Sequence, residues 1–353
     1  MPLDITKIDK NFAVESKINK PDVQFRSVLH APFRIYGVTY DGNCFRRLPE
    51  AVAKSVSNRV HTLSAHTAGG RVRFVTDSPY VAIRAQMPII GKMGHFAFSG
   101  SAGFDLYADG QYVKTFVPSV KITDGYESVI DLGEAKMRQI TVHFPLYSAV
   151  SSLEIGLGQE AALEEAAPYR WEVPVVFYGS SITQGGCASR PGNCYTAILS
   201  RRLDFDHVNL GFSGSGKAEQ AIADYIASLP MSLFVYDYDH NAPDLAHLEA
   251  THERMFQTIR KKNPQLPILI LSRPKYLLTE AEKQRLAVIK RTWENAVKAG
   301  DKNVYFLEGP KLMAIAENEG TVDGTHPNDL GFYSMAKALE PMIADILQKE
   351  TNA

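Results

Sequence analysis

The sequence predicts an α/β protein in which an N-terminal β-sandwich of the jelly-roll kind precedes a domain built on a parallel β-sheet. Short alternating runs between turn residues fill the first half of the chain, whereas apolar runs alternate with helical patterns in the second half. The length of 353 residues exceeds what one core usually holds. We therefore place a β-sandwich at residues 1–160 and an α/β domain at 171–353, with a linker or short helix at 159–170.

The predicted strands of the first half lie between residues 33 and 155. Arg71–Val75, Tyr80–Ala85 and Gln139–Phe144 alternate or run apolar, and Gly, Asp and Pro clusters separate such runs. Residues 1 to about 28 are expected to be irregular. Pro49–Val56 has the texture of a helical turn. Many short strands at this spacing are typical of a sandwich.

The second half predicts a buried parallel sheet. Val173–Tyr178, Leu266–Leu271 and Asn303–Leu307 are apolar runs of strand length, with helical patterns between them. Thr279 and Glu282 have the spacing of a capping box, which starts a helix running to about Ala299. Helices alternating with strands place the strands in parallel and cover both faces of the sheet.

Two polar motifs lie at opposite ends of this second half. Gly179-Ser180-Ser181-Ile182-Thr183 follows the first strand, and Asp323-Gly324-Thr325-His326 lies near the C-terminus. A serine hydroxyl needs a base to take its proton, and a carboxylate holds that base in the right tautomer. Each motif alone is a plausible turn or helix cap. Together they predict Ser181 as nucleophile, His326 as base and Asp323 as the orienting acid, which is the chemistry of ester hydrolysis.

Such a reaction also needs hydrogen-bond donors for a tetrahedral oxyanion. The candidates are the backbone N–H groups of Ser181 and Gly214 and the side-chain amide of Asn241. Gly214 lies in a glycine-rich turn, residues 209–216, after a short apolar run. A phosphate-binding P-loop is excluded there, because Gly216-Lys217 is followed by Ala218 and not by Ser or Thr.

These blocks, in this order, resemble the SGNH (GDSL-type) hydrolases over residues 171–348. The resemblance implies a flavodoxin-like three-layer α/β/α sandwich and an esterase, with Ser181, Gly214, Asn241 and His326 as the four family residues and Asp323 as the triad acid. Two blocks depart from the usual pattern: Ser180 stands where Asp is usual, and Asp239-His240-Asn241-Ala242 lacks the usual glycine and final acid.

A subgroup with an extra N-terminal β-domain carries a Gly-x-Asp-Leu-Tyr motif, and Gly103-Phe104-Asp105-Leu106-Tyr107 is similar to it. Members of that subgroup are often carbohydrate acetylesterases. The resemblance therefore implies a carbohydrate or oligosaccharide ester as substrate.

Further residues near the motifs are candidates for substrate binding. Arg190 and Asn193 could bind substrate hydroxyls or brace the loop that follows Ser181, and Lys275 ends another strand. The aromatic side chains of the first half form either a sugar platform or sandwich core. Asp237, Asp239 and His240 are not expected to form one metal site, and no metal or other cofactor is expected. Cys187 and Cys194 flank the nucleophile loop, and an odd cysteine count favours free thiols over a pair.

Composition limits the partners. A net charge of −1 without a basic cluster predicts no nucleic-acid partner, and no apolar run approaches the about 18 residues of a membrane span. The N-terminus lacks the pattern of a signal peptide, so we expect a cytoplasmic protein, or a secreted or periplasmic one if a signal was removed. A homo-oligomer is possible.

The expected activity is hydrolysis of small acyl esters, chiefly acetyl esters of a carbohydrate. A short acyl group is favoured because nothing in the sequence suggests a long apolar tunnel. The alternatives are a lipase or thioesterase, and a carbohydrate-binding protein whose catalytic half has decayed. The N-terminal half could also serve assembly and not touch substrate.

Overall fold

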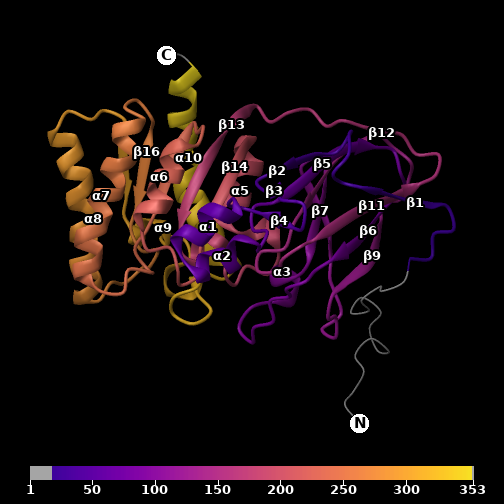
Figure 1. Cartoon of the computed structure of the whole chain (residues 1–353), viewed down its shortest axis with the longest axis horizontal. Coiled ribbons are helices and arrows are strands. Elements are labelled where there is room, and N and C mark those ends of the chain that lie inside the picture. Colours follow the sequence, from indigo (N-terminus) through magenta and orange to yellow (C-terminus); the bar gives the residue numbers. More distant parts are fainter. Residues whose placement is uncertain (1–17, 352–353) are drawn as a thin grey trace, which may run out of the picture.

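A computed structural model describes residues 18–351, and the expected irregular stretch at 1–17 lies outside these residues. Figure 1 shows antiparallel sheets on one side of the molecule and a parallel sheet with its helices on the other. In the described part of the chain, no helix has both the length and the apolar character that a membrane crossing requires.

Two antiparallel sheets form the N-terminal sandwich. The order in the first is β1 (Val23–Ser27), β11 (Ser152–Gly158), β6 (Tyr80–Gln86) and β9 (Gly125–Asp131). The order in the second is β12 (Leu163–Glu164), β5 (Arg71–Thr76), β10 (Arg138–His143), β7 (Phe104–Ala108) and β8 (Gln111–Phe116), with β2 (Arg34–Tyr36) also paired to β5. One core cluster takes side chains from both sheets, among them Ile83, Ile155, Phe74 and Ile140. The predicted sandwich is therefore confirmed.

One segment differs from the expectation. Residues 23–27 are not irregular, since β1 pairs with β11 along its whole length and sets Val23 and Phe25 against the sandwich. Of the two alternatives for residues 159–170, the linker holds: the segment contains no helix, and β12 within it pairs with β5. The helical turn expected at Pro49–Val56 is confirmed as the helix α1 (Glu50–Val56), which is followed directly by α2 (Asn58–Ser64) with Ser57 as its N-cap.

A five-stranded parallel sheet forms the second half, in the order β14 (Phe205–Gly211), β13 (Trp171–Gly179), β15 (Leu233–Asp237), β16 (Ile268–Leu271) and β17 (Val304–Leu307). Counting these strands along the chain, the order is second, first, third, fourth and fifth, which is the flavodoxin-like arrangement. The order of connections reverses beside β13. Ligands of such sheets bind outside the carboxyl ends of the strands at this reversal.

Helices cover both faces of the parallel sheet. Alternate residues of β13 point to opposite faces: Val175 and Phe177 pack with α5 (Tyr195–Leu203) and α10 (Asp329–Thr351), while Val176 and Tyr178 pack on the other side. The helices of that second side are α6 (Gln220–Ser228), α7 (Leu245–Lys262) and α8 (Glu280–Lys298). The capping box at Thr279 and Glu282 is present and begins α8 as predicted.

The Gly-x-Asp-Leu-Tyr motif connects the two halves. Asp105, on β7, is fully buried and accepts hydrogen bonds from the Arg190 guanidinium (2.9 Å), the Gly192 N–H (2.7 Å) and the Thr115 hydroxyl (2.7 Å). Tyr107 also bonds Arg190 through its hydroxyl. Because Arg190 and Gly192 lie in the loop after Ser181, the motif holds that loop against the sandwich.

This buried ion pair generates a stability prediction. Asp105→Ala leaves the Arg190 charge unpaired in a largely buried position, so the free energy of unfolding should fall by about 3–5 kcal/mol. The matched control is Glu127→Ala, which removes a partner of Arg84 from a pair whose side chains are 41% and 40% exposed. That change should cost about 1 kcal/mol or less. Urea unfolding of both variants is the measurement, and equal losses would contradict a special role for Asp105.

Candidate active site

A tight turn at the end of β13 presents Ser181. Ser180 caps the short helix α4 (Ser181–Gln184), since its hydroxyl accepts the Ile182 N–H at 3.1 Å. A Cβ on Gly179 would lie 2.2 Å from the Thr183 hydroxyl oxygen, so only glycine fits there. Ser180 therefore supplies the cap of the nucleophile helix.

The loop before α10 orients His326. One carboxylate oxygen of Asp323 accepts the backbone N–H groups of Thr325 (3.0 Å) and His326 (2.8 Å), and the other lies 2.7 Å from Nδ1 of His326. Partial burial acts to raise the pKa of Asp323, but these hydrogen bonds outweigh it and hold the pKa at about 2. Asp323 is therefore a carboxylate at neutral pH, and it places Nδ1–H of His326 toward itself.

The second ring nitrogen of His326 faces the serine. Nε2 lies 2.9 Å from Oγ of Ser181, whose exposed fraction is 7%. Hydroxyl, imidazole and carboxylate thus form one continuous hydrogen-bonded series, although 145 residues separate Ser181 from His326 in the chain. Such a series can move a proton from Oγ to Nε2 while Asp323 stabilises the imidazolium.

Known proteins share both halves of this architecture. The sequence profile of the GDSL-like lipase/acylhydrolase family matches residues 172–344, and the GxDLY profile, for the N-terminus of SGNH-hydrolase-type esterases, matches residues 23–163. A protein of Bacteroides ovatus ATCC 8483, described as a GDSL-like lipase, has a crystal structure with 30% sequence identity and a TM-score of 0.83. That match covers 92% of this chain and 98% of the other. The chain belongs to the GDSL-like lipase/acylhydrolase family.

Two more distant structures show the same fold. The salicylyl-acyltransferase SsfX3 of a tetracycline biosynthetic pathway is 22% identical, with a TM-score of 0.75 and coverage of 93% of this chain and 98% of that one. A family two carbohydrate esterase of Clostridium thermocellum, in complex with cellohexaose, is 15% identical, with a TM-score of 0.62 and coverage of 90% and 99%. No curated protein sequence matches significantly. The predicted resemblance and the three-layer fold are confirmed, and the chain is a carboxylic ester hydrolase by family.

The loops after β14 and β15 bring the other family residues of this GDSL-like hydrolase to the same edge of the sheet. The turn after β14 passes close to β13, since a Cβ on Gly216 would lie 2.3 Å from the Gly179 carbonyl oxygen. Gly214 adopts the left-handed conformation at φ 65°. The Asn241 amide donates to the Phe212 carbonyl at 2.8 Å, so it is tied to the same turn. Their roles as oxyanion donors stay a prediction.

Arg47 is a positioning residue that the sequence analysis missed. This residue lies in the N-terminal half, and its guanidinium is fully buried. The hydrogen bonds described for it all go to backbone carbonyls, including those of Asn209 (2.9 Å) and Gly211 (2.6 Å) on β14. Burial lowers the pKa of Arg47 to about 9, which still leaves it charged at neutral pH. It fixes the end of β14, from which the Gly214 turn departs. Nothing in the local sequence around Arg47 indicates this contact.

The three predicted substrate-binding residues have protein partners. Arg190 bonds Asp105 and Tyr107, as described above. The Asn193 amide donates to the Asp329 carboxylate at 3.0 Å, and the Lys275 ammonium lies 2.8 Å from Glu282. For Arg190 and Asn193 these contacts fit the alternative that they brace the loop after Ser181. Substrate binding by the three stays a prediction.

Asp237 and Asp239 have different surroundings. Asp239 pairs with Arg285 at 2.7 Å and accepts the Arg273 N–H at 3.2 Å. Asp237, at the end of β15, accepts the hydroxyls of Thr183 (2.9 Å) and Tyr195 (3.2 Å) beneath the nucleophile turn. Burial raises the pKa of Asp237 to about 7.

The cysteines are free thiols, as the sequence favours. Cys187 follows the nucleophile helix, and burial, aided by the Asp323 charge, raises its pKa to about 11. It is therefore a protonated thiol at neutral pH and not a competing nucleophile.

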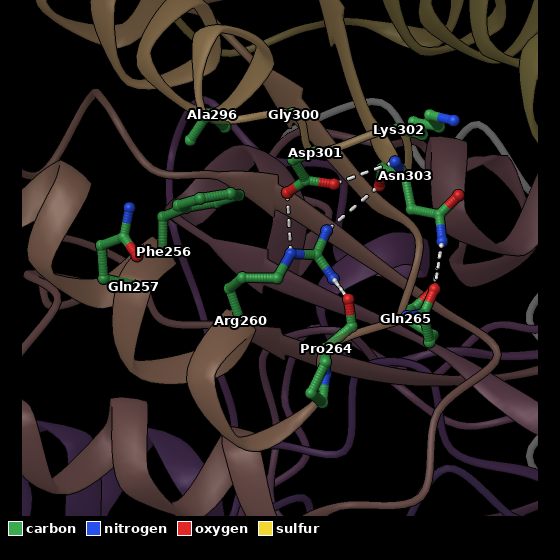
Figure 2. Close-up of a pocket in the computed structure, with 11 residues that line it drawn as sticks. Phe256, Gln257, Arg260, Pro264, Gln265, Ala296, Gly300, Asp301, Lys302 and Asn303 are labelled. Atoms are coloured by element: carbon green, nitrogen blue, oxygen red, sulfur yellow. Dashed lines mark hydrogen bonds and ion pairs between the residues drawn. The ribbon is translucent and has the colours of Figure 1, made fainter.

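A cavity of about 430 Å³ lies at the opposite edge of the parallel sheet, between the C-terminal ends of α7 and α8 (Figure 2). Arg260 crosses it and is fully engaged, with Asp301 at 2.8 Å and the carbonyls of Leu266 (2.6 Å) and Asn303 (3.2 Å) as partners. These contacts join two helix ends to two strand starts. The cavity is therefore a structural junction, remote from the carboxyl edge that holds Ser181.

Asp237 generates a prediction about stability and pH. Burial raises the pKa of its carboxyl to about 7 in the folded chain, from the ordinary value of 3.8 that applies in the unfolded chain. Between these two pH values, the folded state therefore holds a proton that the unfolded state has lost. The stability of the folded state should therefore fall as pH rises through this window, by roughly 2–4 kcal/mol in total. Asp237→Asn removes this loss and should gain stability relative to the wild type between about pH 5 and 8.

Urea unfolding across that pH range tests the prediction. Asp345→Asn, at an exposed position of α10, is the control and should follow the wild-type profile. If Asp237→Asn also runs parallel to the wild type, Asp237 does not carry the proton.

Proposed function

We propose that this hydrolase is a serine esterase that works through Ser181, His326 and Asp323. Oγ of Ser181 attacks the ester carbonyl carbon while its proton passes to Nε2 of His326. That proton then goes to the leaving alcohol oxygen as the ester C–O bond breaks, which leaves an acyl-serine. Water attacks the acyl-serine with His326 again as base, and the acid is released. The single observation that carries the proposal is the continuous Ser181–His326–Asp323 hydrogen-bond series.

We further assign the hydrogen bonds that stabilise the oxyanion to the backbone N–H groups of Ser181 and Gly214 and to the side-chain amide of Asn241. Asn241 has two amide hydrogens, and only one is needed for its bond to the Phe212 carbonyl. The glycine-rich turn and Asn241 both follow strands that flank β13, at the edge where β13 leads to Ser181, which supports this assignment. Loss of one such donor usually costs about 100- to 1000-fold in rate.

We further propose that the substrate carries a small acyl group, chiefly acetyl, on a carbohydrate. We favour a short acyl chain because nothing in the sequence suggests a long apolar tunnel for the acyl group. A carbohydrate alcohol is supported by the two-part architecture shared with the cellohexaose-bound esterase, which at 15% identity is a likeness of fold.

Turnover of p-nitrophenyl acetate, butyrate and octanoate tests both parts. We expect hydrolysis to fall with chain length, and Ser181→Ala to lower kcat by at least about 10³- to 10⁴-fold. The matched control is Ser180→Ala, next in sequence, which loses a helix cap worth about 1 kcal/mol and should keep most of the activity. Release of acetate from acetylated oligosaccharides then tests the carbohydrate.

Three results would change the proposal. Octanoate hydrolysed faster than acetate would favour the lipase alternative. Turnover that survives in Ser181→Ala would remove Ser181 as nucleophile. Turnover of p-nitrophenyl acetate without release of acetate from acetylated sugars would support the serine mechanism. It would contradict the proposal of a carbohydrate substrate.

A further inference from the structure

A group of metal-binding side chains lies beside the candidate active site. His95, Cys187 and His326 each offer one ligand atom, and these three atoms lie within 4.8 Å of one another. His95 comes from the loop between β6 and α3 (Phe98–Ser101) of the N-terminal half, and its ring centroid lies 5.9 Å from that of His326. We propose that these three residues form a site for a thiophilic divalent cation such as Zn²⁺, and that the bound ion switches off His326.

The donor set fits such an ion. Imidazole nitrogen and thiolate sulfur are the ligands that Zn²⁺ prefers, and three protein ligands with one open position are a common zinc arrangement. Zn–N bonds of about 2.0–2.1 Å and Zn–S bonds of about 2.3 Å place neighbouring nitrogen and sulfur ligands about 3.3–3.6 Å apart. The present separations, which reach at most 4.8 Å, therefore need to shrink by up to about 1.5 Å. His95 is exposed and can rotate to close that gap.

Packing holds the three segments together without the ion. Phe96, next to His95, is buried in the core of the parallel-sheet half and meets Tyr147 edge to face at 5.1 Å. The Ser99 hydroxyl donates to the Ser189 carbonyl at 2.6 Å, which ties the His95 loop to the segment just after Cys187. The backbone of Cys187 has a φ of 77°, a left-handed conformation that glycine adopts more easily. The fold thus fixes the backbone segments that carry the ligands, while the exposed His95 ring keeps freedom to rotate.

The state of His326 decides which atom binds. Nδ1 is held by Asp323 at 2.7 Å, so Nε2 is the ring nitrogen whose lone pair can coordinate the ion. A carboxylate on the other ring nitrogen is the usual surrounding of a histidine that binds zinc. Nε2 is also the atom that lies 2.9 Å from Ser181. An ion bound there occupies the lone pair that would accept the serine proton, and binding releases the thiol proton of Cys187 to solvent.

Cobalt binding tests the site independently of catalysis. Co²⁺ titrated into the wild-type chain should give a thiolate-to-cobalt charge-transfer band, which Zn²⁺ removes by displacement. Cys187→Ser should abolish the band, and His95→Gln should weaken binding at least about tenfold. The matched control is Cys194→Ser, a buried cysteine outside the group, which should keep the band. No band in the wild type, or a band that survives in Cys187→Ser, would overturn the site.

Inhibition tests the second half of the proposal, which rests on the proposed esterase activity. Zn²⁺ should inhibit p-nitrophenyl acetate hydrolysis reversibly, with recovery on adding EDTA, and His95→Gln should raise the half-inhibiting concentration at least about tenfold. Equal inhibition of wild type and His95→Gln would overturn control of His326 through this site. If no ester is hydrolysed at all, the proposed function fails, while the cobalt titration still decides whether the metal site exists.

Discussion

The close approach of two backbone segments at the carboxyl edge of the parallel sheet, the turn after β13 and the turn after β14, sets the positions of Ser181 and Gly214. Because Gly179 has no side chain, the Thr183 hydroxyl can pack directly against its Cα, and Gly216 packs in the same way against the Gly179 carbonyl. That carbonyl also accepts the Phe212 N–H at 2.9 Å. A side chain at either glycine would push the nucleophile turn away from the turn that carries Gly214. The site therefore depends on backbone packing before any side-chain chemistry.

The N-terminal half forms part of the frame around this edge. Arg47 binds the end of β14, Asp105 holds the loop after the nucleophile, and the Tyr147 hydroxyl donates to the Ser181 carbonyl at 3.2 Å. These contacts give the N-terminal half a structural role beside Ser181, while its part in assembly or in substrate binding stays a prediction. The intact Ser181–His326 contact likewise argues against a decayed catalytic half.

The sequence predicted the features that local patterns encode. The apolar run of β13, the capping box at Thr279 and the two polar motifs each have a short-range signal, and the family resemblance placed them in one fold. Arg47 and the His95–Cys187–His326 group were missed because their partners lie far away in the chain and no spacing rule connects them. Strand β1 was missed because only two apolar residues, the half-buried Val23 and Phe25, mark its inner side.

The cores of the parallel-sheet half have a consequence for how this architecture can diversify. They include Leu146 and Tyr147 on one face, and Leu48 and Leu63 on the other, all supplied by the first half of the chain. A gene fusion that exchanged one half for a foreign module would leave apolar holes on both faces of the sheet. The side chains of each half thus restrict which side chains the other half can accept, so the two halves are not interchangeable parts.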